Sequence, residues 1–208
     1  MNTEKTIKLI GTLLGIILFI GLIAGISYAF ITWRSSEVGI SGDTECFTIN
    51  YTKGQTITNQ NVILFDESTI INDNKITVKN GMAMTDVTAY IDSDCNVTGN
   101  IEITLNVTDI NSAYISGNSI GAFKYVVASY DPNVYSDITT TALEGEAFDI
   151  IKIDSITNTG EVYLANDELT NTEKGFLIIF YIDGYLAMND AWNSTFNATI
   201  TASAVQTG

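Results

Sequence analysis

The order of hydrophobic and polar residues divides the chain into two parts. From Leu9 to Trp33 there are 25 residues without a charged side chain, whereas later segments alternate apolar and polar residues. In Ile101–Val107, the clearest of these, every second residue is apolar. A period of two is typical of a strand with one buried face. The sequence therefore predicts one continuous apolar segment followed by a β-rich domain.

Further segments of the second part have the pattern of strands. Alternation recurs in Phe47–Tyr51, Val87–Ile91, Phe123–Val127 and Phe196–Ala204. More fully buried strands are indicated where apolar residues are denser, in Val62–Phe65, Phe148–Ile153 and Phe176–Ile182. Residues 111–122 and 131–147 are expected to be longer loops, the second with a short helix near Thr140–Gly145. About nine or ten strands at this spacing, with one proline, predict an all-β fold, an antiparallel β-sandwich.

The apolar segment is long enough to cross a membrane, because a helix needs about 20 residues to do so. Lys5 and Lys8 precede it and Arg34 follows it, so the positive-inside rule places the N-terminus in the cytoplasm. We expect residues 1–29 to be a cytoplasmic tip and a transmembrane or signal helix, with the apolar run continuing to about residue 33. Residues 30–208 are then an extracellular or cell-surface β-sandwich domain.

Whether this helix is cleaved or retained is open on the sequence. Ser27 and Ala29 put small residues at the −3 and −1 positions of a signal-peptidase site before Phe30. Against cleavage, the apolar run is longer than the apolar region of an ordinary signal peptide. We favour cleavage, and both alternatives export the domain.

Cleavage before Phe30 would create a short, apolar, β-prone N-terminus made of Phe30, Ile31, Thr32 and Trp33. This segment could serve as a donor strand that adds to the sheet edge of another copy or of a related surface subunit. It could also pack against its own domain. If the helix is retained, the same residues complete it, with Trp33 at the membrane interface.

The only two cysteines, Cys46 and Cys95, both follow the apolar run. An even pair in an exported domain predicts a disulfide. Two buried free thiols are the alternative.

Charge is distributed as unevenly as hydrophobicity. Seven of the nine basic residues and 23 of the 24 acidic residues follow residue 29, which gives that part a formal charge of −16. Such a surface repels nucleic acid and anionic lipid headgroups, so we expect no nucleic-acid partner. The pairs Asp66 with Glu67, Asp92 with Asp94 and Asp131 with Asp137 could bind calcium, but no stretch matches a calcium-binding loop. We expect no metal and no cofactor, with calcium as the alternative.

No motif of an enzyme is present. The chain has no histidine, which removes the Ser-His-Asp and Cys-His arrangements and the histidine-ligated zinc sites. Nucleophile elbows and phosphate-binding loops are also missing. We therefore predict no catalytic residue and no enzymatic activity. A surface glycan hydrolase that uses a carboxylate pair is the weakest alternative.

Two segments resemble a known family. The apolar leader ending Ser27-Tyr28-Ala29 with Phe30–Trp33 after it, and the C-terminal strand Phe196–Gln206, resemble exported biofilm-matrix and surface proteins of the TasA/camelysin type from Gram-positive bacteria. The resemblance implies a jelly-roll sandwich and assembly into fibres by donor-strand exchange. We therefore expect a structural or adhesive cell-surface protein, a subunit of an extracellular matrix fibre. A membrane-anchored monomeric binding domain is the alternative.

Overall fold

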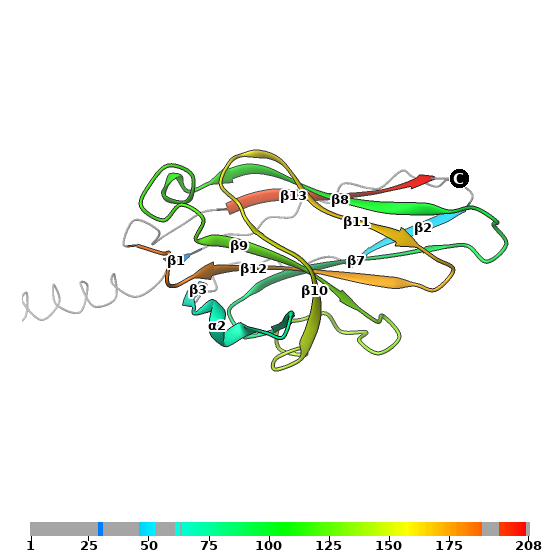
Figure 1. Ribbon diagram of the computed structural model, residues 1–208, viewed down its shortest axis with the longest axis horizontal. Helices are drawn as coiled ribbons and strands as arrows, with labels where there is room; N and C mark the ends of the chain where they lie inside the picture. The colour runs from blue at the N-terminus through cyan, green and yellow to red at the C-terminus, as the bar shows by residue number, and fades with distance from the viewer. Residues whose placement is uncertain (1–28, 31–45, 53–60, 63, 189–195, 207–208) are drawn as a thin grey trace, which may run out of the picture.

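The computed structural model describes residues 29–30, 46–52, 61–62, 64–188 and 196–206, and these are built almost entirely from β-strands (Figure 1). Their helical elements are the one-turn helix α2 (Glu67–Ile70) and the 3-10 turn η1 (Ser112–Tyr114). The predicted all-β class is confirmed. The predicted helix near Thr140–Gly145 is wrong, because those residues form turns.

The strands form one large sheet, one small sheet and one isolated pair. The large sheet has the order β2 (Phe47–Thr52), β7 (Ala83–Ile91), β12 (Lys174–Asp183), β9 (Phe123–Tyr130), β10 (Ala147–Ser155), β6 (Lys75–Thr77) and β5 (Ile71–Asn72). A further strand, β4 (Leu64–Phe65), runs parallel to the end of β12. The small sheet has the order β11 (Gly160–Leu169), β8 (Gly99–Ile110) and β13 (Phe196–Gln206). The isolated pair is β1 (Ala29–Phe30) with β3 (Asn61–Val62). All described pairings except that of β4 are antiparallel.

The large and small sheets lie one above the other and share a core (Figure 1). One face of β8, in the small sheet, points into this core, and its Ile101, Ile103 and Leu105 are fully buried. Aromatic rings fill one end of this core, where the ring centroids of Phe123 and Phe196 are 4.6 Å apart. The arrangement is that of a β-sandwich, as the alternating pattern predicts.

The outer face of the large sheet has a second core, which the alternating pattern does not reveal. Leu177, Ile179 and Tyr181 of β12 lie there beneath α2 and the segments around Leu143 and Phe148. Strand β12 is therefore covered on both faces, which explains its unbroken apolar run and confirms the prediction of a fully buried strand.

Two predicted buried strands differ from the structure. In β10, Ile151 is 39% and Ile153 is 38% exposed, because β6 pairs only with Ala147–Asp149 and β10 bulges just beyond. The segment Val62–Phe65 contributes to two short strands, and Leu64 in the second is 40% exposed. Both segments lie at margins of the sheets, where apolar side chains reach solvent.

Among the described residues, none of the helices is long and apolar enough to span a bilayer. The predicted span, residues 9–33, lies outside the described residues except for Ala29 and Phe30.

Candidate functional site

Strand β13 forms one margin of the small sheet. Among the described strands it pairs only with β8, from Phe196 opposite Ile110 to Gln206 opposite Gly99. Its core-facing side chains, Phe196, Ala198, Ile200 and Ala202, are buried. Thr201 and Ser203 alternate with them and are exposed on the outer face. One side of β13 is thus fixed by the core and by β8.

The composition of β13 is unusual for a sheet margin. None of its 11 residues is charged and none is proline. Natural edge strands are normally protected by charges, by proline, by short length or by bulges, because an unprotected edge pairs with strands of other molecules. The only irregularity in the pairing of β13 with β8 is a bulge between Asn197 and Ala198, close to its first residue. From Ala198 to Gln206 the strand has none of these protective features.

The opposite margin of the same sheet, strand β11, is protected. It carries Glu161, Asp167 and Glu168, and it bulges in its middle. The ammonium of Lys152 from β10 donates a hydrogen bond to the main-chain carbonyl of Tyr163, with 2.6 Å between nitrogen and oxygen. This carbonyl already has a partner, and the charge above it opposes the approach of another strand. The two margins therefore differ in their capacity to accept an added strand, and β13 is the candidate site.

The predicted cleavage and donor residues are described only at Ala29 and Phe30. These two form β1, in which Ala29 lies opposite Val62 and Phe30 opposite Asn61. Ser27 and residues 31–33 lie outside the described residues. The first residue of the predicted donor segment is therefore extended and paired within its own chain, and its cleavage and donor roles stay predictions.

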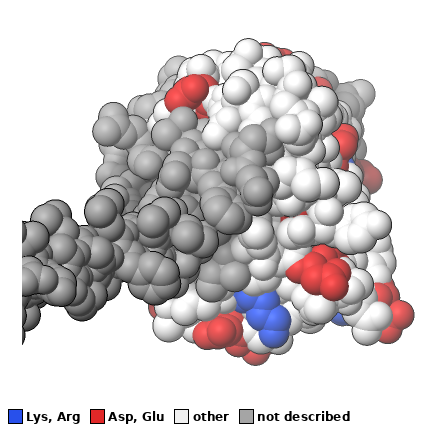
Figure 2. Space-filling model, turned by 90° about the vertical axis from the view of Figure 1, so that its left-hand side faces the viewer, with Lys and Arg blue, Asp and Glu red and all other residues white. Residues whose placement is uncertain are grey.

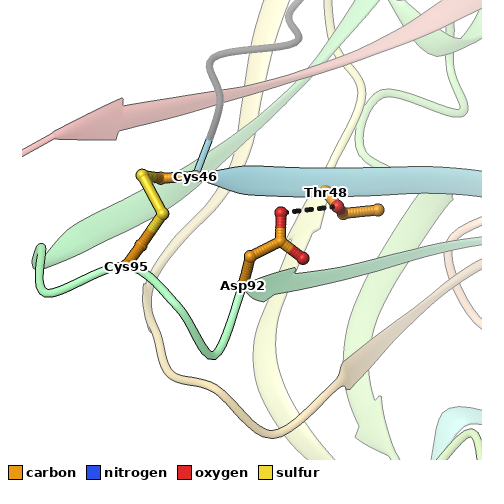
Figure 3. The surroundings of a disulfide bond; sticks show 4 residues. All are labelled: Cys46, Thr48, Asp92 and Cys95. Atoms are coloured by element: carbon orange, nitrogen blue, oxygen red, sulfur yellow. Dashed lines mark hydrogen bonds between the residues drawn. A yellow bond between two sulfur atoms is a disulfide. The ribbon is translucent and has the colours of Figure 1, made fainter.

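Cys46 and Cys95 are joined by a disulfide, with 5.6 Å between their Cα atoms (Figure 3). The bond links the residue before β2 to the loop after β7. Asp92 strengthens this link, because its main-chain N–H donates to the carbonyl of Cys46 and its carboxylate accepts from Thr48. The disulfide holds the beginning of β2 at the margin of the large sheet.

The predicted carboxylate pairs are partly occupied by protein donors. Asp66 caps α2 by accepting from the main-chain N–H of Ser68, with 3.0 Å between the two atoms. Glu67 accepts from the hydroxyl of Tyr181 at 2.8 Å. In the loop after β9, Asp131 accepts from the main-chain N–H of Asn133. The part of the chain that the structure describes brings together no group of three or more potential metal ligands.

Two buried tyrosines bonded to carboxylates are features that sequence reasoning missed. The hydroxyl of Tyr130 donates to Asp86, and that of Tyr181 donates to Glu67. Burial raises the pKa of both tyrosines well above the ordinary value, and the hydrogen bond to a carboxylate raises it further. Asp86 is 1% exposed, so the first pair is closed to a substrate and has a structural role. Its only signal in the sequence is an aspartate inside an apolar strand.

No protein-family model matches the chain, and neither a curated protein nor a solved structure matches it significantly. The fold and the margin of β13 therefore carry the argument about function.

Proposed function

We propose that the protein is an exported structural protein of the cell surface, a subunit of an extracellular matrix fibre that assembles when a strand of one copy adds to β13 of another. The observation that carries this proposal is the margin of β13, which is long, uncharged and free of proline. No catalytic step is part of the proposal.

An added strand is stabilised by main-chain hydrogen bonds along its length, and side chains on alternate positions supply the specificity. Residues 198–206 span about 30 Å at the usual rise of a strand. A donor strand made of Phe30–Trp33 and some of the residues after it would fit along this length. In the single chain, β1 pairs with β3 over two residues on each strand, so transfer of Phe30 to another copy would disrupt little pairing.

Charge favours one mode of contact between copies. A chain with a formal charge of −15 repels its own copies over most orientations. Contact through β13 brings together a surface without charged side chains, which lowers that repulsion. Assembly is accordingly expected to be faster at higher ionic strength, because salt screens the remaining acidic surface.

The resemblance of the two ends of the chain to proteins of the TasA/camelysin type supports the same function. From this resemblance we also propose that the strands have a jelly-roll order and that a signal peptidase removes the leader. The disulfide between Cys46 and Cys95 is not part of that resemblance. In the proposal it keeps β2 attached to the large sheet outside the cell.

The proposal is tested by the intact mass of the protein recovered from intact cells, together with electron microscopy of the same material. A mass that begins at Phe30, with fibres in the images, is the expected result. A mass that retains Met1 or Asn2 would overturn assembly by the free N-terminal segment.

The second candidate is a membrane-anchored monomeric surface domain. The pairing of β1 with β3 in the same chain favours it, because there Phe30 is engaged within its own molecule. This candidate predicts the retained N-terminus and no fibres.

A further inference from the structure

Four exposed apolar side chains gather at one end of the sandwich. Tyr185 is 85% exposed, Met188 54%, Ile120 53% and Leu64 40%. These exposures are unusual beside a core in which most apolar side chains are buried. Apolar side chains in contact with water are unfavourable in free energy, and a second surface that covered them would remove this cost.

Main-chain contacts bring these four residues together from three separate segments. The main-chain N–H of Met188 donates to the hydroxyl of Ser119, next to Ile120, at 2.8 Å. The N–H of Gly184, next to Tyr185, donates to the carbonyl of Phe65, next to Leu64, also at 2.8 Å. We call Leu64, Ile120, Tyr185 and Met188 the end patch.

The end patch lies where the N-terminal segment joins the domain. Leu64 is two residues beyond β3, and β3 pairs with β1, which contains Ala29 and Phe30. In Figure 1, β1 and β3 lie at the same end as the loop of residues 111–122 and the end of β12. The 28 residues before β1 include most of the predicted membrane span, so the chain enters the domain from this end.

Charged side chains of both signs border the patch. Figure 2 views this end, and the described atoms there include uncharged residues together with acidic and basic side chains. Near the patch, the ammonium of Lys124 lies 3.7 Å from the carboxylate of Glu67, so part of the local charge is compensated. An acidic protein is repelled by anionic headgroups, so a zwitterionic bilayer is the lipid surface that this end can approach most easily.

We propose that the end patch rests on the headgroup layer of the lipid bilayer while the chain retains its apolar N-terminal segment. Tyrosine at the border between apolar and polar surroundings is typical of membrane interfaces. Tyr185 and Met188 lie in the loop after β12 and present no strand edge, so a lipid surface fits them better than an added strand from a second copy. The inference rests on membrane insertion of the apolar residues 9–28, which precede β1, and is independent of fibre assembly.

This orientation has a consequence for processing. With the end patch on the headgroups, the junction between Ala29 and Phe30 is held close to the bilayer surface. A membrane-embedded peptidase would then reach the bond between Ala29 and Phe30 after release of the two-residue pairing of β1 with β3 alone.

The test uses the full chain in phosphatidylcholine vesicles that contain lipids spin-labelled at the headgroup. An environment-sensitive fluorophore is placed at Tyr185→Cys, and in a control variant at Val134→Cys, which replaces a side chain that is 67% exposed in the loop between β9 and β10. Both sites are on the surface, so the label should not disturb the fold, and circular dichroism checks this.

The inference predicts that the label at residue 185 is blue-shifted and quenched several-fold more strongly by the spin-labelled lipid than the label at residue 134. Equal quenching at the two sites would overturn it. A blue shift at residue 185 that grows with the protein-to-lipid ratio, without quenching by the labelled lipid, would also overturn it. The patch would then face a second copy. A chain that does not float with the vesicles would overturn the inference together with the predicted membrane span, and leave the fibre proposal standing.

Discussion

The ring of Tyr130 occupies the space where a side chain of Gly175 would stand. A Cβ atom added to Gly175 would overlap Cε1 of Tyr130. The two residues are opposite each other on β9 and β12, and β7 is the next strand. Because Gly175 has no side chain, the ring can cross β12 and its hydroxyl can reach Asp86 on β7. The glycine, the ring and the buried carboxylate therefore form one unit across three strands.

Substitution Gly175→Ala should destabilise the domain by about 1–3 kcal/mol, because the added methyl group forces the ring or the backbone to move. Urea unfolding followed by circular dichroism measures the change. The control is the same substitution in a Tyr130→Ala background, where the ring is absent and the cost should largely disappear. An equal cost in both backgrounds would show that the ring is not what makes glycine necessary.

Alkaline pH should destabilise the fold through Tyr130 and Tyr181. Burial and a carboxylate partner raise the pKa of both phenols in the folded state, while the unfolded chain ionises near the ordinary value. Their contribution to stability is fully present below about pH 10 and is lost as the pH rises above it, by up to about 1.4 kcal/mol per pH unit for each tyrosine.

The free energy of unfolding, measured between neutral pH and the alkaline limit of stability, checks this prediction. The variant Tyr130→Phe should be less stable at neutral pH and should lose less stability than the wild type above pH 10. Tyr135→Phe is the control at neutral pH, because its hydroxyl bonds the exposed Glu146 and its loss should cost little. A wild-type slope identical to that of Tyr130→Phe would contradict the account.

Loss of the disulfide should cost about 2–5 kcal/mol, since it closes a long loop in the unfolded chain. Its cysteines are 49 residues apart in sequence. The double variant Cys46→Ser with Cys95→Ser, and the wild type with and without reductant, should show the same loss in urea unfolding. If the wild type keeps its stability under conditions that mass analysis shows to reduce the bond, the disulfide does not stabilise the fold.

A lysine on the outer face of β13 should block fibre assembly. Thr201→Lys puts a charge on the exposed face of the proposed site, as natural edge strands do. Thr104→Lys is the matched control, because Thr104 lies directly opposite Thr201 on the central strand β8. Thioflavin fluorescence and electron microscopy should show loss of fibres for the first variant only. Normal fibres from Thr201→Lys would remove β13 from the assembly surface.

The sequence predicts best those strands that have one face on the core and one in solvent. Ile101–Val107 and Phe196–Ala204 belong to the small sheet, whose outer face is exposed, so their side chains alternate. Strand β11 also has one face on the core and one in solvent, but its residues do not alternate regularly. Its bulge between Tyr163 and Ala165 shifts the alternation by one residue and places Leu164 and Ala165 both in the core.

Long-range relationships were beyond the sequence for a different reason. The lack of charge in β13 is visible in the sequence, but its place at a sheet margin depends on strand order. The contact of Tyr130 with Gly175 and Asp86 likewise depends on the neighbours of β12. The pairing of Cys46 with Cys95 was predictable because only two cysteines exist. Ile151 and Ile153 are exposed because β6 pairs with β10 only as far as Asp149, and the local sequence of β10 does not show where its neighbour ends.

Hydrogen–deuterium exchange of the protein before and after assembly tests the role of β13 most directly. Main-chain amides of residues 196–206 should become more protected in the assembled material, whereas those of residues 160–169 in β11 should change little. Added protection in β11, or unchanged exchange in β13, would contradict strand addition at this margin.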